Sequence, residues 1–510
     1  MSERAYIKDP NDSHQAFLVA AERRRTKMGQ WKPALLALAS TLGYGTSLWP
    51  NTQNGQPVDP HVLNNFGGWS FYVPGGDVGR YNIPSSMFSG CEVEQVNHLM
   101  RHDFRGPSKG VGSGIAAMIS KLVNASNADN AQWKFHIGDG EEHPELEFLS
   151  NLKEDYEAVT PELLTAYGEQ DAHASGYRFQ KEYGHLLGHR DWYNAPINQS
   201  LPVFVRTTDQ SRVNVTSWAF SEGFMGLDWR KRLAAPLLTM PDSLATFNDS
   251  LAVGTCPYSS NDTSSDDAFA AWTNVWLPKV VQRLQRALPN LNLTTFDVQA
   301  LQNVCPFQSA YLGHLSPFCA IFSLREWELY SYGQDLQQYE NAGYGGSLGR
   351  AWSVGWVNEL LARLTDSPVK DHTSTNTTLD ANKETFPLGL PVYLDFTHDT
   401  QVASAIAVMG LLKDKLSPTS YPQKDRLWNA AHIVPMGARI AVERLACKNK
   451  PHKYVRVILN DAVLPLSGLK ECGVQAQGRK HAAAGLCKVD DFVASQSFAQ
   501  SGGNWKNCYL

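Results

Sequence analysis

The chain has 510 residues, 43% of them hydrophobic and 19% charged, which predicts a large globular domain with a second domain or a sizeable insertion. Lysine and arginine number 45 against 50 aspartate and glutamate residues, so the formal net charge is -5 and a nucleic-acid partner is not expected. No apolar run reaches the roughly 18 residues of a membrane span, so stable membrane insertion is not expected either.

The start of the chain has features of a secretion leader. A basic zone precedes the apolar stretch 33–39, PALLALA, and residues 37–39 have the small-x-small form of a signal-peptidase site. Residues 1–39 are therefore predicted to be a polar leader and a signal peptide, with Met28 as an alternative start. A short buried helix or a terminal tail is the competing interpretation. Residues 40–85, rich in Gly, Pro and Asn, predict an extended arm over the surface.

Strands and helices alternate in the next part of the chain, as in an α/β domain. The predicted elements are a strand at 93–100, a helix through 115–122, a helix at 161–187 with Thr160 as its N-cap, a strand at 202–206 and a helix at 213–224. Residues 265–365 show helical patterns that no strand interrupts, which predicts a helical insertion. A strand returns at 392–396 before an amphipathic helix, and a late hairpin is predicted across Asn460-Asp461.

Three of the predicted strand ends carry side chains suited to an anion. The first runs into RHDFRGP at 101–107, the second ends at Arg206, and the third runs into His398-Asp399. Ligands of open α/β sheets bind beyond the carboxyl ends of the strands. We therefore expect three arginines, two histidines and one aspartate to meet at one edge of the sheet.

These residue types fit phosphoryl transfer. The reaction needs positive charge around the phosphate oxygens, an in-line nucleophile and a proton for the leaving oxygen. Arg101, Arg105 and Arg206 offer forked donors that match phosphate, and a histidine can attack phosphorus when its nitrogen is unprotonated. Asp399 is the acid placed to protonate the leaving group. No metal-ligand cluster accompanies this set, so neither a metal nor another cofactor is expected.

The R-H-x-x-R-x-P element at 101–107, together with the distant His398-Asp399, resembles the histidine acid phosphatases. Further segments are similar to the fungal phytases (3-phytases) of that family: LTAYGEQ at 164–170, VRTTDQSRV at 205–213, SPFC at 316–319, NELLARLTDSPVKDHTSTN at 358–376, FPLGLPVYLDFTHD at 386–399, VRVILNDAVLPL at 455–466 and SGGNWKNC at 501–508. The resemblance extends from about Cys91 to the C-terminus.

The resemblance implies an α/β fold, a phosphoglycerate-mutase-like three-layer αβα domain with a mainly helical second domain or insertion. The phosphatase unit would span 86–510. Its α/β core would comprise approximately 86–125, 158–260 and 385–510, and its helical part approximately 261–384.

The resemblance also implies roles for individual residues. His102 would be the nucleophile that forms a covalent phosphohistidine, and Asp399 the proton donor. The phosphate ligands would be Arg101, Arg105, Arg206 and His398, with Lys109 as a further substrate contact. The expected protein is a monomeric acid phosphatase for small anionic phosphate esters, with phytate-like substrates included. A broad phosphatase for small monoesters and a phosphate-binding secreted glycoprotein with little turnover are the alternatives.

The catalytic motif departs from the fungal form, which usually reads RHGARYPT where this chain has RHDFRGPS. Glycine is replaced by Asp103, alanine by Phe104 and tyrosine by Gly106. If the Asp103 carboxylate faced the phosphate, this carboxylate would repel the phosphate and raise the pKa of His102. If it pointed away, it would only cap the following turn.

Cysteines and glycosylation sequons point to an oxidising, extracellular setting. The cysteine count is even and no CxxC pair occurs. The resemblance implies the pairs Cys91–Cys447, Cys256–Cys508, Cys305–Cys319 and Cys472–Cys487. The N-x-S/T sequons are Asn124, Asn198, Asn214, Asn248, Asn261, Asn292 and Asn376.

Overall fold

The computed structural model divides the chain into two units, Met1–Leu48 and Trp49–Leu510. The structure describes residues of the second unit: 52–53, 56–57, 60–72, 83, 90–126, 143–152, 162–188, 200–242, 246–254, 256–473 and 476–509. The predicted leader and most of the predicted arm lie outside these residues. No helix in the described ranges is long and apolar enough to cross a membrane.

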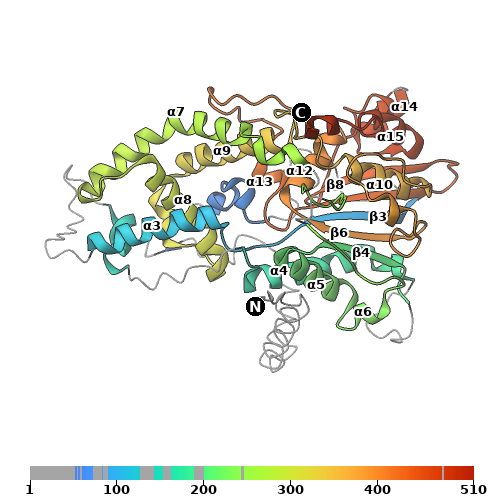
Figure 1. Ribbon diagram of the computed structural model, residues 1–510, viewed down its shortest axis with the longest axis horizontal. Helices are drawn as coiled ribbons and strands as arrows, with labels where there is room; N and C mark the ends of the chain where they lie inside the picture. The colour runs from blue at the N-terminus through green and yellow to red at the C-terminus, as the bar shows by residue number, and fades with distance from the viewer. Residues whose placement is uncertain are drawn as a thin grey trace, which may run out of the picture. The chain divides into compact units, whose positions relative to one another are not determined.

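A mixed β-sheet organises this unit (Figure 1). In spatial order its strands are β10 (Cys487–Lys488), β8 (Lys453–Leu459), β7 (Arg439–Cys447), β3 (Cys91–Arg101), β6 (Val392–Thr397), β4 (Val203–Thr208) and β5 (Leu238–Met240), with β9 (Ala462–Val463) paired to β8. Neighbours from β3 to β5 are parallel, and those from β3 to β10 are antiparallel. Every residue of β4 and β6 is buried, as expected for parallel strands covered on both faces.

Helices cover both faces of the sheet (Figure 1). On one face, α4 (Ala166–Tyr183) and α5 (Ser211–Met225) pack through a core that includes Phe179, Phe220 and Phe396. On the other face, α10 (Val354–Thr365) and α12 (Asp399–Val408) pack through a core that includes Trp356 and Ile406. The predicted α/β class with a sheet between helical layers is therefore confirmed.

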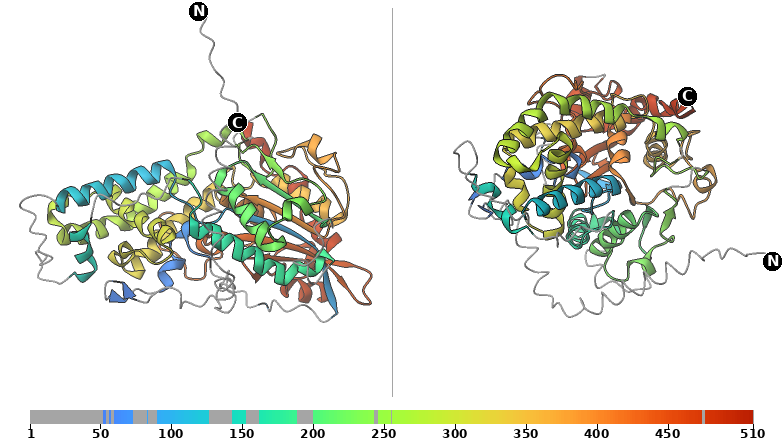
Figure 2. Two further views of the ribbon diagram at one scale, coloured as in Figure 1. Left: turned by 90° about the horizontal axis from the view of Figure 1, so that it is seen from below. Right: turned by 60° about the vertical axis from the view of Figure 1, so that its left-hand side comes forward.

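A separate hydrophobic core holds a helical region beside the sheet. Its long helices are α3 (Lys109–Ser126), α7 (Ser264–Ala287), α8 (Thr295–Leu312) and α9 (Leu324–Ala342). Figure 2 shows the cyan α3 and the yellow-green α7 to α9 lying together beside the sheet in two further views. Trp272 and Trp327 are fully buried at the centre of this core.

The remaining elements are short. The other helices are α6 (Trp229–Arg232), α11 (Thr377–Asp380), α13 (Ala430–Ile433), α14 (Ala476–Ala483), α15 (Val489–Ser495) and α16 (Ser497–Gln500), and β1 (Thr52–Gln53) pairs with β2 (Gln56–Pro57). The 3-10 helices are η2 (Pro60–Asn64), η3 (Gly67–Trp69), η5 (Pro144–Asn151), η6 (Gly184–Leu187), η8 (Pro257–Asn261), η9 (Pro289–Leu291), η10 (Pro317–Ile321), η11 (Glu471–Gly473) and η12 (Trp505–Tyr509).

Two element ends differ from the sequence-based expectation. Helix α4 begins after Thr165, whose Oγ1 accepts the N–H of Gly168 at 3.0 Å, so Thr165 and not Thr160 is its N-cap. Strand β4 continues to Thr208, two residues beyond the predicted end at Arg206. Because β4 ends at Thr208, Arg206 lies within the strand, and a different arginine lies beyond the edge of the sheet.

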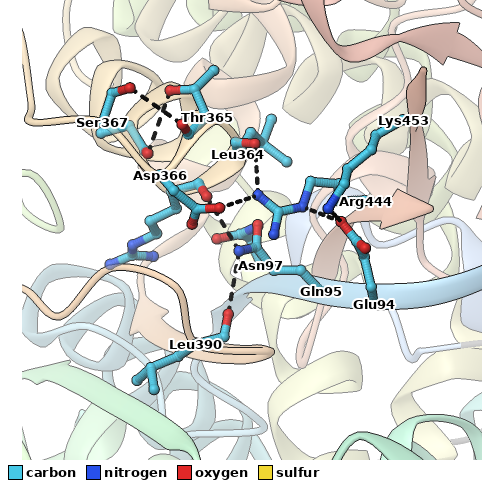
Figure 3. Close-up of polar contacts among 12 residues, drawn as sticks. Glu94, Gln95, Asn97, Leu364, Thr365, Asp366, Ser367, Leu390, Arg444 and Lys453 are labelled. Carbon is cyan, nitrogen blue, oxygen red and sulfur yellow. Dashed lines mark hydrogen bonds and ion pairs between the residues drawn. The ribbon is translucent and has the colours of Figure 1, made fainter. Parts of the chain in front are cut away.

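Arg444 of β7 fastens the sheet to the end of α10 (Figure 3). Its Nη1 donates to the carbonyl oxygen of Leu364 and to Asp366 Oδ2, both at 2.8 Å, and its Nε lies 2.6 Å from Glu94 Oε1. A cation at the carboxyl end of a helix satisfies free carbonyl groups and favours the helix dipole. Gln95 of β3 adds a bond to the carbonyl oxygen of Leu390 at 3.2 Å.

The structure pairs the cysteines as the resemblance implied, in the bridges Cys91–Cys447, Cys256–Cys508, Cys305–Cys319 and Cys472–Cys487. The first bridge joins the start of β3 to the end of β7, where the two residues face each other in the ladder. Of the sequons, Asn198 lies outside the described residues and Asn214 and Asn376 are partly buried. The exposed ones are Asn124, Asn248, Asn261 and Asn292.

Candidate active site

Parallel strands β3 and β6 place two histidines side by side. Arg101 lies opposite Thr397 in their register, so the next residue of each strand leaves the sheet at the same edge. These residues are His102 and His398, whose ring centroids are 5.6 Å apart. The backbone N–H of His102 donates to the carbonyl oxygen of Thr397 at 2.9 Å, which fixes the two strand ends relative to each other.

The His102 imidazole is buried in a defined tautomer. Its Nδ1 lies 2.9 Å from the carbonyl oxygen of Asp103. Because a carbonyl can only accept, Nδ1 carries the hydrogen and Nε2 keeps its lone pair. Burial lowers the pKa of His102 well below its ordinary value, and the positive charges of Arg101 and Arg105 lower it further. The ring therefore stays neutral in acid, where an exposed histidine is protonated.

Arg101, the last residue of β3, is fully buried next to the proposed acid. Its Nη2 lies 3.2 Å from Asp399 Oδ2. Its Nη1 donates to the carbonyl oxygens of Gly68 and Val434. These backbone acceptors come from the segment around η3 and from the residue after α13, so distant parts of the chain hold this guanidinium in place.

Asp399 begins α12 and is half-buried. Its Oδ1 accepts the backbone N–H of Thr400 at 3.1 Å, and its Oδ2 accepts Gln338 Nε2 of α9 at 3.0 Å. Burial by itself would raise the pKa of Asp399, but the positive charges of Arg101 and Arg105 outweigh burial and hold it below the ordinary carboxyl value. A bound phosphate would offset those charges and so favour the protonated acid.

The structure does not bring Arg206 to this group of residues, which corrects the expectation that it binds phosphate. In the β4–β6 register Arg206 lies opposite Asp395, two residues before β6 ends. Its Nε is 2.8 Å from Asp395 Oδ1 and its Nη2 is 2.6 Å from Glu359 Oε2. All three side chains are buried, so the guanidinium of Arg206 is neutralised inside the protein.

Arg212, which sequence reasoning missed, takes the expected position. It is the second residue of α5, beyond the true end of β4. Its positive charge is among the causes that lower the pKa of His102, Arg101 and Arg105, the last to about 10, so it faces the same space. Its Nε has no hydrogen-bond partner among the described residues. The sequence contained a signal for Arg212, because it is the first arginine after Thr208, where β4 ends.

A second unpredicted residue, Asp242, lies just beyond β5. Its Oδ1 is 3.3 Å from His398 Nε2, and its backbone N–H donates to Asp209 Oδ1 at 2.9 Å. The carboxylate is therefore placed beside the second imidazole. Among the residues that the structure describes, no three or more His, Cys, Asp or Glu side chains are grouped to hold a metal ion.

Comparison with known proteins identifies the family. The profile of the Histidine phosphatase superfamily (branch 2) matches residues 92–460, most of the chain. The chain belongs to this family. Phytase A of Aspergillus terreus is 35% identical over 457 residues, which cover 86% of this chain and 90% of the relative. Phytase A of Aspergillus oryzae is 34% identical over 433 residues, which cover 82% and 85%. The chain is therefore a phosphomonoesterase of the histidine acid phosphatase type.

Solved structures agree with this assignment. The crystal structure of the phytase from D. castellii is 25% identical, with a TM-score of 0.68 over 92% of each chain. The multiple inositol polyphosphate phosphatase of Bifidobacterium longum, in complex with inositol hexasulfate, has a TM-score of 0.58 at 12% identity, over 85% of this chain and 97% of that one. The second likeness concerns the fold alone.

The two bulky departures in the motif of this histidine phosphatase point into the protein. Asp103 is fully buried, and its Oδ1 accepts the N–H of Phe104 at 2.7 Å, so it caps the following turn. Phe104 packs against Phe71 and Tyr167, with ring centroids 4.5 Å and 5.1 Å away. The pKa of His102 is lowered and not raised. Lys109, the first residue of α3, has an exposed side chain.

Proposed function

We propose that this phosphatase hydrolyses its esters through a phosphohistidine on His102. In the first step, His102 Nε2 attacks phosphorus, the ester oxygen leaves, and Asp399 gives that oxygen its proton. In the second step, a water molecule attacks phosphorus and gives its proton to Asp399, and the nitrogen–phosphorus bond breaks. Both residues thereby return to their starting states. The phosphate is bound throughout by Arg101, Arg105, Arg212 and His398.

The burial of the His102 ring, with Nδ1 bound to the carbonyl oxygen of Asp103 and Nε2 left with its lone pair, is the observation that carries this proposal. A nucleophile must be unprotonated, whereas the leaving group needs an acid, and in free solution no single pH suits both. Burial among guanidinium groups keeps His102 unprotonated at a pH where a carboxylic acid can hold its proton. The arginines supply the positive charge that phosphoryl transfer requires.

We infer that the substrates are inositol polyphosphates of the phytate type. Relatives that match most of this chain are named Phytase A. The formal net charge of -5 opposes anion binding, so the local guanidinium cluster must attract the substrate. Lys109, exposed at the start of α3, is proposed as a further contact with the outer phosphates of the substrate.

Secretion is part of the same proposal. Two disulfides join distant parts of the chain and two close short loops, and such bridges are common in proteins of oxidising compartments. Exposed sequons on α3 and on the loops are compatible with glycosylation. We propose that residues 1–39 contain the leader that directs secretion, and that the mature phosphatase is a monomer.

Phosphate release from phytate and from p-nitrophenyl phosphate tests the function. We expect an optimum between roughly pH 3 and 6, because Asp399 must hold a proton while phosphate is bound. The His102→Ala variant should lose activity by on the order of a thousandfold or more on both substrates. The ratio of the two rates shows whether inositol polyphosphates are preferred. An optimum above about pH 7 would contradict the role of Asp399.

A further inference from the structure

Asp103 makes three hydrogen bonds, one of them to the nucleophile. Its carbonyl oxygen accepts His102 Nδ1 at 2.9 Å, and its backbone N–H donates to Thr216 Oγ1 of α5 at 3.0 Å. Its side-chain Oδ1 accepts the N–H of Phe104 at 2.7 Å. The side chain thus holds the same peptide unit that sets the tautomer of the nucleophile.

The Asp103 carboxyl is closed off from water. Asp103 is 0% exposed, and its Oδ2 has no hydrogen-bond partner among the described residues. A Cβ atom at position 437 would lie 2.8 Å from Oδ2, so Gly437 leaves the room that the carboxyl occupies. Helix α4 also approaches closely, since a Cβ atom on Gly168 would lie 2.4 Å from the carbonyl oxygen of Phe104. Oδ2 has little freedom to turn toward solvent.

The charged groups around Asp103 are mixed in sign. Helix α4 contributes Asp171 and Arg178, and strand β7 contributes Arg439. Its own segment contributes Arg101, which interacts electrostatically with it. Arg439 is already paired with Asp461, at 3.3 Å, and binds Ser175 Oγ at 3.0 Å. No guanidinium is hydrogen-bonded to Oδ2 of Asp103 among the described residues, and a buried charge on that oxygen is costly.

We propose that Asp103 is a positioning residue that works as a neutral carboxylic acid, fixing the turn that supplies the Nδ1 acceptor of His102 and weakening the site when it loses its proton. This inference rests on the proposed phosphohistidine chemistry. Loss of the proton would place a negative charge beside Arg101, where it competes with the phosphate. It would also favour opening of the turn toward water, which displaces the acceptor of His102.

The expected titration of Asp103 agrees with this geometry. Burial raises its pKa well above the ordinary carboxyl value, and the nearby Asp171 raises it further. Between the ordinary and the raised pKa, the folded protein binds one proton more than the unfolded chain. The free energy of unfolding should therefore fall as the pH rises through that interval. The stabilisation is complete in acid and is lost as the pH rises through the raised pKa of Asp103.

The Asp103→Asn variant tests the proposal, because asparagine has the shape of the neutral acid and cannot ionise in this range. We would measure kcat at saturating substrate from about pH 4 to about pH 8 and compare the variant with the wild type. Ionisation of Asp399 and of the substrate is common to both proteins and cancels in the ratio. The ratio should be within about threefold of one at pH 4 and should rise about tenfold or more once the pH exceeds the raised pKa of Asp103.

Asp249→Asn is the matched control. Asp249 is also a buried cap, with Oδ1 accepting the N–H of Leu251 at 2.7 Å, and burial raises its pKa to about 7. It has no hydrogen bond to His102 among those described. Its charge interacts with that of Asp242, which lies beside His398, so the kcat ratio of this variant to the wild type should rise with pH less than that of Asp103→Asn. A ratio that rises equally in both variants would mean a general effect on stability and would overturn the proposal.

Two further outcomes are decisive. A flat kcat ratio for a folded Asp103→Asn protein would refute the positioning role, as would failure of this isostere to fold at pH 4.

The Asp103→Gly variant lacks the side-chain cap. Its kcat should therefore fall at pH 4, while the dependence of its kcat on pH should follow that of Asp103→Asn. If the wild type releases no phosphate, the proposed function fails. Thermal unfolding against pH then still tests the ionisation of Asp103, since the wild type should lose more stability with rising pH than Asp103→Asn does.

Discussion

Replacing Arg212 with alanine is expected to lower kcat/KM for phosphate esters by about 10² to 10³, the usual effect of removing one preorganised donor from a charged transition state. The guanidinium lies beyond the end of β4 and acts on the pKa of His102, Arg101 and Arg105. Because Arg212 is partly exposed, its removal should leave the free energy of unfolding within about 1 kcal/mol of the wild type.

Arg206→Ala is the contrasting variant. It would leave Glu359 buried without its guanidinium partner and Asp395 with a single guanidinium, that of Arg363 at 2.8 Å. Breaking such a buried pair should cost about 3 to 5 kcal/mol of stability. Steady-state kinetics and thermal unfolding of both variants separate the two roles. The assignment of phosphate binding to Arg212 would be wrong if Arg206→Ala folded and lost more kcat/KM while Arg212→Ala remained fully active.

The second large effect is expected at Asp399 and should depend on the leaving group. Asp399→Asn removes the proton donor but keeps the shape of the side chain. For an alkyl phosphate such as phytate, kcat should fall by about 10² to 10⁴, since the departing alkoxide needs a proton. For p-nitrophenyl phosphate the loss should be much smaller, because nitrophenolate leaves without one.

The control for this experiment is Gln338→Ala. Gln338 Nε2 donates to Asp399 Oδ2 at 3.0 Å, so its loss would disturb the position of Asp399 without removing the acid. This variant should slow phytate hydrolysis far less than Asp399→Asn does and should leave hydrolysis of p-nitrophenyl phosphate nearly unchanged. An equal loss on both substrates in Asp399→Asn would show that Asp399 binds phosphate or supports the fold and does not protonate the leaving group.

Local patterns were sufficient to predict β3, β4, β6 and the catalytic motif. The apolar residues of β3 and β6 are followed by polar ones, so His102 and His398 could be placed at one edge of the sheet. The hairpin after β8 was also predictable, because Asn460 and Asp461 tolerate the positive φ angles of 48° and 67° that its turn requires.

The error at Arg206 came from a strand end, which sequence patterns define poorly. Thr207 and Thr208 are polar but suit a strand, and they extend β4 past Arg206. The register against Asp395 then turns Arg206 into a buried ion pair. Such a pairing depends on contacts between residues far apart in the chain, which no local pattern contains.

The environment of Asp103 was unpredictable for the same reason. Its orientation depends on the close approach of α4 at Gly168 and on the space left by Gly437, just before β7. Strand β7 was not predicted at all, although it pairs with β3 along most of its length. The sequence could therefore pose the two alternatives for Asp103, and the tertiary structure was needed to choose between them.

Trapping of the phosphoenzyme tests the central claim most directly. The phosphatase would be mixed with radiolabelled substrate at about pH 5, quenched in alkali, which preserves phosphohistidine, and digested for peptide mapping. We predict label on the peptide that contains His102, no label in His102→Ala, and unchanged labelling in His185→Ala, whose histidine is exposed and outside the site. Rapid turnover by the wild type with no label on His102, or label that persists in His102→Ala, would contradict the account.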